Sequence, residues 1–123
     1  MLTASTSTSL FTTLSILLAA LCLTPAFAKL SAQPAMQASA DHFGIEWERY
    51  RLIGVAELAA AVGLVAGLVW HPLGAAAALG MALLVGGALV MHLRAGDGLK
   101  HMAPAVVILL VTIAYLAVAL PTV

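Results

Sequence analysis

The chain has 123 residues, of which 63% are hydrophobic and only 8% are charged, whereas a soluble domain is about half apolar and about a quarter charged. Because so few charges cannot coat a water-facing surface, the composition excludes an ordinary soluble domain. Five basic and five acidic side chains give a net charge of zero, so the chain also lacks the positive surface expected of a nucleic-acid-binding protein.

Four apolar segments of equal length follow one another along the chain, at residues 10–28, 52–70, 73–91 and 102–120. Each is close to the roughly 20 residues that a helix needs to cross about 30 Å of hydrocarbon. Lipid does not tolerate unpaired backbone groups, and no strand-like alternation is present, so these segments should be helices. We therefore predict an all-α, integral membrane four-helix transmembrane bundle. It should form one membrane domain over residues 1–123, with a polar loop at 29–51.

The first segment has two interpretations. Ala26-Phe27-Ala28 follows an apolar run and resembles the cleavage site of a secretory signal, but residues 1–9 contain no Lys or Arg. Retention of the segment would place all five basic residues on one side of the membrane, and that side is the cytoplasm by the positive-inside rule. We therefore expect a retained first span in a bacterial-type inner membrane, with loops 29–51 and 94–101 cytoplasmic and both termini outside.

Small residues predict where the spans pack closely. Ala59, Gly63 and Gly67 recur every four residues in the second span, a stripe that lets another helix approach closely within lipid. The pattern does not distinguish a helix of the same chain from a helix of a second copy in a homo-oligomer. The His71-Pro72 pair leaves almost nothing between spans two and three, which predicts a tight turn there.

Glu57 is the only charged residue inside the four predicted spans. A carboxylate at such depth costs a few kcal/mol and should face the bundle interior. If Arg51 and Arg94 lie at the same level, Glu57 is within reach of His92 or Arg94, and we predict a contact with one of them. The contact would either bind and protonate a small polar group, such as a quinone oxygen, or serve as a structural clasp.

The sequence contains no diagnostic metal or nucleotide motif. His42, His92 and His101 are predicted to lie on one side together with several carboxylates, but without a metal-ligand spacing. The single cysteine, Cys22, excludes an intrachain disulfide and a CxxC site. There is also no Gly-rich phosphate loop, nucleophile elbow or HExxH sequence, so we expect no metal.

Three sequence blocks resemble the DoxX-like family of small four-helix membrane proteins. They are Ala28-Lys29-Leu30, the Ile53–Leu58 segment with Gly63-Leu64 after it, and the Ala88–Asp97 segment with its His-x-Arg-x-x-Asp pattern. The resemblance covers roughly residues 29–120. It implies that the functional positions are Glu57, His92, Arg94 and Asp97, as a candidate polar or quinone site.

The resemblance also implies a function. Characterised relatives are similar to the small subunit of an archaeal terminal quinol oxidase or thiosulfate:quinone oxidoreductase, and others to membrane partners in bacterial oxidative-stress complexes. The expectation is a small subunit or partner of such a quinone-linked system, with a membrane or soluble oxidoreductase beside it, and not a stand-alone enzyme. The alternative is a non-catalytic scaffold or assembly protein. A transporter is disfavoured because no inverted repeat or broken helix is visible.

Overall fold

The computed structural model describes residues 3–123, and over that range it contains helices and no strand, which confirms the all-α prediction. Its elements are α1 (Ala4–Leu30), α2 (Pro34–Phe43), α3 (Trp47–Ala66), α4 (His71–Arg94), α5 (Leu99–Ala119) and the short 3₁₀ helix η1 (Leu120–Thr122).

Three helical segments are long and apolar enough to cross a membrane: α1, α4, and α5 together with η1. The fourth long helix, α3, is not among them, because its 20 residues include four charges, at Glu48, Arg49, Arg51 and Glu57. At about 1.5 Å per residue α3 is nevertheless about 30 Å long. The chain is thus a membrane protein with three candidate spans and a fourth helix of matching length and mixed polarity.

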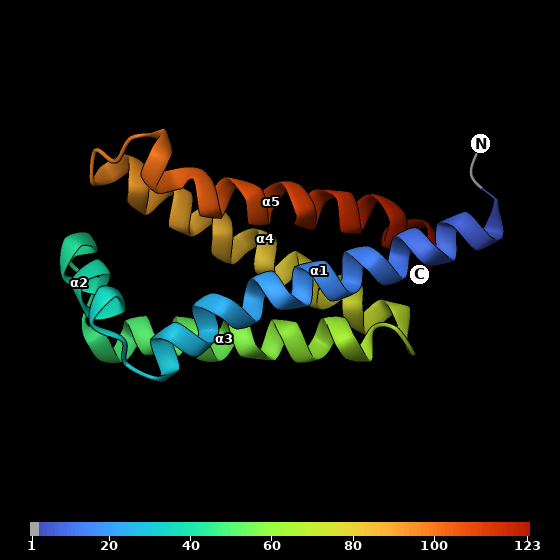
Figure 1. Ribbon diagram of the computed structural model, residues 1–123, viewed down its shortest axis with the longest axis horizontal. Helices are drawn as coiled ribbons and strands as arrows, with labels where there is room; N and C mark the ends of the chain where they lie inside the picture. Colours follow the sequence, from blue (N-terminus) through green and yellow to red (C-terminus); the bar gives the residue numbers. More distant parts are fainter. Residues whose placement is uncertain (1–2) are drawn as a thin grey trace.

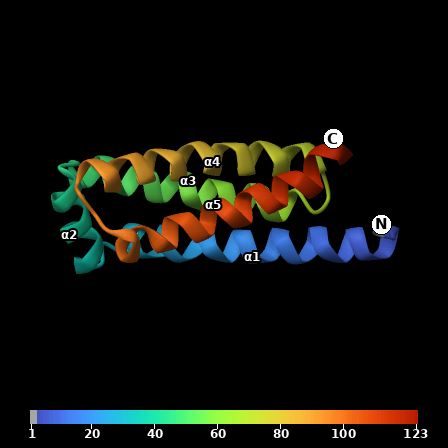
Figure 2. The same ribbon diagram turned by 90° about the horizontal axis from the view of Figure 1, so that it is seen from above.

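The four long helices each pack against two others. α1 lies against α3 and α5, and α4 lies against the same two helices. The start of α1, the C-terminus and the α3–α4 turn lie at one end of the molecule (Figures 1 and 2), whereas α2 and the α4–α5 turn lie at the other. We call these the closed end and the α2 end. All five Lys and Arg residues belong to segments near the α2 end.

The helix boundaries correct two expectations. His71 and Pro72 do not form the turn after span two, because both belong to the first turn of α4, where proline lacks only an N–H that would be unpaired anyway. The turn is formed instead by residues 67–70, so α3 ends at Ala66, before the end of the predicted span. The 29–51 segment is largely helical, since it contains α2, which Gly44 ends with a left-handed φ of 69°.

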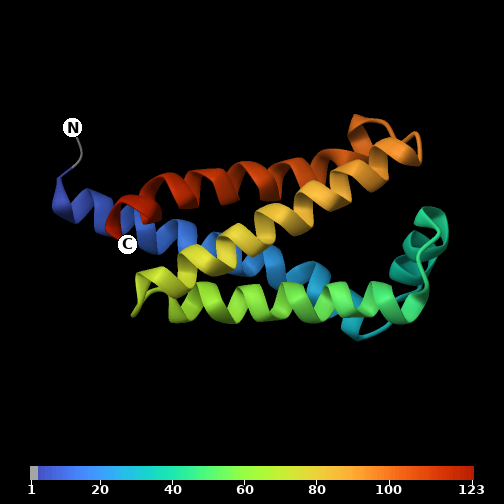
Figure 3. The ribbon, with the colours of Figure 1, turned by 180° about the vertical axis from the view of Figure 1, so that it is seen from behind.

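The small residues of α3 determine how it meets α4. A Cβ atom added at Gly67 would lie 2.5 Å from the Cα of Gly74, and one added at Gly63 would lie 2.8 Å from the Cβ of Ala77. These two glycines therefore face α4 of the same chain. Ala59, the third member of the predicted stripe, is exposed. From the contact at Gly67 the two helices diverge toward the α2 end (Figure 3).

Candidate functional site

The first polar centre is a buried ion pair between α1 and α3. Lys29 lies in the last turn of α1, and Glu57 lies in the middle of α3. The Lys29 Nζ and Glu57 Oε1 atoms are 3.0 Å apart, and each side chain is only 8% exposed. Gly54 permits this approach, because a Cβ atom there would lie 2.8 Å from the Cβ of Lys29. Close packing of the α1 and α3 backbones thus brings the two charged side chains to the same depth along the helices.

The surroundings of this pair are partly aromatic. The Nζ of Lys29 is 5.1 Å from the centroid of the Tyr50 ring, a distance at which an ammonium is attracted to the ring face. Arg51 donates a hydrogen bond of 3.3 Å to the backbone oxygen of Leu30, at the end of α1. Within residues 3–123 the buried Oε1 of Glu57 has no hydrogen-bond or ion-pair partner other than the Lys29 ammonium. The charge of Glu57 is therefore balanced by Lys29 alone.

The predicted contact of Glu57 with His92 or Arg94 was wrong. Glu57 pairs with Lys29, His92 pairs with Asp97, and Arg94 is exposed and forms no ion pair within residues 3–123. The physical reason is the divergence of α3 and α4, which carries the end of α4 away from Glu57 (Figure 3). The end of α1, in contrast, stays packed along α3.

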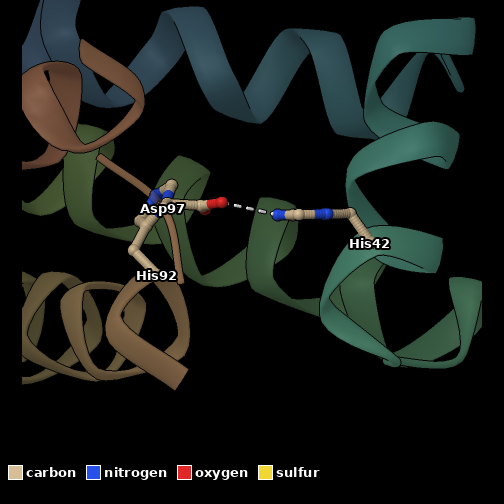
Figure 4. Close-up of polar contacts among 3 residues, drawn as sticks. All are labelled: His42, His92 and Asp97. Atoms are coloured by element: carbon tan, nitrogen blue, oxygen red, sulfur yellow. Dashed lines mark hydrogen bonds and ion pairs between the residues drawn. The ribbon is translucent and has the colours of Figure 1, made fainter. Parts of the chain in front are cut away.

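The second polar centre is a carboxylate held between two histidines, and we call it the His–Asp–His cluster (His42, Asp97, His92). Asp97 Oδ1 is 2.7 Å from Nε2 of His42, and Asp97 Oδ2 is 2.7 Å from Nδ1 of His92. Figure 4 shows His42 extending from α2 toward the α4–α5 turn that carries Asp97. The cluster thus joins α2 to the end of α4.

Local backbone geometry brings Asp97 back to His92. Gly96 takes a left-handed φ of 75°, which glycine adopts without steric cost, and the Asp97 N–H donates to the His92 backbone oxygen at 3.0 Å. The Asp97 side chain is 9% exposed, that of His92 16% and that of His42 50%. Hydrogen bonds from His92 and then His42 lower the pKa of the Asp97 carboxyl below its ordinary value. The cluster is therefore built around an ionised carboxylate.

The cluster leaves one ring nitrogen of His92 available. Its Nδ1 donates to the Asp97 carboxylate, so a neutral His92 carries its lone pair on Nε2. That Nε2 atom has no hydrogen bond within residues 3–123, and the ring of Phe43 meets the His92 ring edge-on at 5.0 Å between centroids. A carboxylate that orients a histidine in this way prepares the free nitrogen to accept a proton.

The four predicted site residues do not form one site, because they lie at three separate positions in the structure. His92 and Asp97 lie together, Glu57 lies in the ion pair, and Arg94 lies apart. Lys29 and His42 were missed as site residues. Lys29 had a signal, because it directly ends the first apolar run. His42 was already expected on the same side as His92, but its contact with Asp97 depends on α2. Within residues 3–123 no group of three or more His, Cys, Asp and Glu side chains is placed to hold a metal ion.

Comparison with known proteins identifies a protein family. The model of a family described as DoxX-like matches residues 13–115, a range that includes both polar centres. No curated protein and no solved structure matches the chain.

Proposed function

This chain belongs to the DoxX-like family, and from that membership and its buried polar groups we propose that it is a small membrane subunit of a quinone-linked oxidoreductase or oxidative-stress system. The observation that carries the proposal is the buried Lys29–Glu57 pair. Apolar side chains of similar volume would stabilise a buried site as well or better, so packing alone does not require two charges there. Ionisable groups at this depth in a membrane protein typically mark a functional site.

The chemistry of a quinone suits these groups. A quinone becomes a quinol by taking up two electrons and two protons, and in this proposal the partner oxidoreductase supplies both electrons. The part of this chain is to hold the head group and deliver protons. The ammonium of Lys29 can donate a hydrogen bond to a quinone oxygen, and Glu57 and the Nε2 atom of His92 can exchange protons.

The proposal includes an orientation in the membrane. With α3 as the fourth span, the segments 29–51 and 94–101 face the cytoplasm of a bacterial-type inner membrane and both termini lie outside, which follows the positive-inside rule. Both polar centres then lie toward the cytoplasm, where a soluble partner can dock. Single cysteines at Ser39 or Ser5 in a Cys22→Ala background test this. A membrane-impermeant thiol reagent added to right-side-out vesicles should label only the Ser5→Cys protein.

The decisive experiment is purification from its native membrane in mild detergent, followed by extraction of bound quinone and identification of copurifying proteins. The wild type should retain a quinone and an oxidoreductase. The double variant Lys29→Met with Glu57→Leu removes both charges together and should lose the quinone while keeping its fold. Lys100→Gln, which changes an exposed charge at the same end, is the matched control and should retain it.

Other outcomes of that purification have definite meanings. A partner without quinone would support the non-catalytic scaffold or assembly protein instead. A folded protein with neither quinone nor partner would overturn the proposal.

A further inference from the structure

We propose that the groove between α3 and α4 binds the isoprenoid tail of a membrane quinone, with the quinone head at the α2 end. This inference rests on the proposed function and adds to it a second binding region. Neither the family match nor the polar centres assign any role to this groove.

The groove has the size and chemistry of a site for an apolar ligand. Its volume is about 370 Å³, within the range of about 300–1,000 Å³ typical of ligand pockets. Its walls contain only alanine, glycine, leucine and methionine. On the α3 side they include Ala59 and Gly63, and on the α4 side Ala76, Gly80, Met81 and Leu84. No wall side chain carries a hydrogen-bond donor or a strong acceptor, so the groove suits a hydrocarbon occupant.

The shape of the groove favours a linear chain over a helix. At the closed end the space disappears, because the backbones of Gly67 and Gly74 are in contact, and it widens as α3 and α4 diverge (Figure 3). A helix about 10 Å in diameter cannot enter such a taper, whereas a chain one methylene wide can follow it. Gly80 keeps the groove open, since a Cβ atom there would meet nothing within 4 Å.

The position of the groove favours a tail attached to a polar head. Two of its wall residues, Ala56 and Ala60, flank Glu57 in α3, and Ala60 lies only about 60° around the helix from Glu57. The wide end of the groove therefore lies next to the face that carries the buried Lys29–Glu57 pair. A molecule with one polar head and one linear apolar tail matches both features.

The expected contribution of the tail is modest. An isoprenoid chain moves from lipid hydrocarbon into an equally apolar groove, so it gains close packing and no hydrophobic transfer energy. We expect about a fivefold tighter binding of a long-tailed quinone than of a short-tailed quinone with the same head.

The test uses Trp47 as a reporter of the head group. The chain has two tryptophans, and Trp70→Phe leaves only Trp47, whose ring centroid is 6.1 Å from that of Tyr50 beside Lys29. The Trp70→Phe protein in phospholipid nanodiscs is titrated with long-tailed and short-tailed ubiquinone while quenching of Trp47 fluorescence is followed. Concentrations are expressed per lipid, so that differences in partitioning cancel.

The groove is then filled from one wall. Gly80→Leu should lower the affinity for the long-tailed quinone about fivefold and leave that for the short-tailed quinone unchanged. Ala76→Leu, from the same wall, should act alike. Gly86→Leu is the matched control, because a Cβ atom at Gly86 also meets nothing within 4 Å and Gly86 does not line the groove. It should bind both quinones as the Trp70→Phe parent does.

The outcomes separate this inference from the proposed function. If neither quinone quenches Trp47, the proposed function fails. If both quinones bind equally well and Gly80→Leu changes nothing, the function stands and the groove proposal is overturned. If Gly80→Leu instead converts a cross-linkable dimer into a monomer, the groove is an interface between copies of this chain, and the tail site is likewise overturned.

Discussion

The two ends of the molecule are held together by different kinds of contact. At the closed end, Gly67 and Gly74 bring the backbones of α3 and α4 together, and the Phe11 ring packs against those of His71 at 4.3 Å and Tyr115 at 5.5 Å. At the α2 end α3 and α4 lie farther apart (Figure 3), although α1 still meets α3 closely at Gly54. There the Lys29–Glu57 pair and the His–Asp–His cluster join them.

The closed end is therefore stabilised mainly by close packing, whereas the α2 end depends more on contacts between charged groups. Contacts between backbones depend on volume and do not change with proton concentration, whereas contacts between ionisable groups respond to charge and pH. The closed end should therefore be sensitive to added methyl groups. The α2 end should be sensitive to unpaired charges, and it is the end at which ligand chemistry can be coupled to structure.

The largest effect is expected from unpairing the buried charges. Glu57→Leu alone leaves the Lys29 ammonium buried without its partner, a change that typically costs about 3–5 kcal/mol. The double variant Lys29→Met with Glu57→Leu removes that unpaired charge and should recover most of the loss. The free energy of unfolding in mixed detergent micelles measures both. Equal stability of the single and double variants would show that the pair is not a coupled unit.

An added methyl group at the closed end should have a smaller effect. Gly67→Ala places a Cβ atom 2.5 Å from the Cα of Gly74, and because a backbone atom cannot rotate away, the helices must separate. Overpacking of this kind costs about 1–3 kcal/mol. The same unfolding measurement applies.

Gly80→Ala is the control for that substitution, since it adds the same methyl group where nothing lies within 4 Å. It should be neutral or stabilise the protein by up to about 1 kcal/mol through higher helix propensity. If both variants lose the same stability, the close approach at Gly67 does not explain the result.

The sequence predicted the apolar framework better than the polar contacts. Segment length and the absence of charge identified the regions of α1, α4 and α5, because in lipid these properties almost decide the structure. Boundaries were less accurate. Pro72 was interpreted as part of a turn although it lies in the first turn of α4, since proline is compatible with both positions.

The polar contacts depend on where helices lie relative to one another, which periodicity does not report. Glu57 was correctly expected to be buried, but its partner was sought on α4 because an even antiparallel spacing was assumed. The observed divergence of α3 and α4 leaves α1 as the closer neighbour. The contact of His42 with Asp97 depends on α2, a helix within a segment that was expected to be a loop. A candidate residue could thus be found from sequence, but its partner required the fold.

The smallest effect, confined to the α2 end, is expected from acidification of the His–Asp–His cluster. The pKa of Asp97 in the folded protein lies below its ordinary value of about 3.9. The stabilisation that the ionised Asp97 carboxylate gives the folded protein is therefore complete above that ordinary value. It is lost as the pH falls through the lower folded-state pKa. Because either charge state of histidine can donate a ring N–H, the contact should persist between pH 7 and pH 5.

Spin labels on Ser39→Cys in α2 and Lys100→Cys in α5, in a Cys22→Ala background, report this contact as a distance. The distance should be constant from pH 7 to pH 5 and should lengthen only once the pH falls through the lowered pKa of Asp97, as α2 loses its hydrogen bond to the α4–α5 turn. With Asp97→Asn the distance should already be longer at pH 7 and should not change on acidification, because no carboxylate remains to be protonated. An Asp97→Asn distance as short at pH 7 as that of the wild type would mean that packing of Phe43 on His92, and not the Asp97 carboxylate, holds α2 in place.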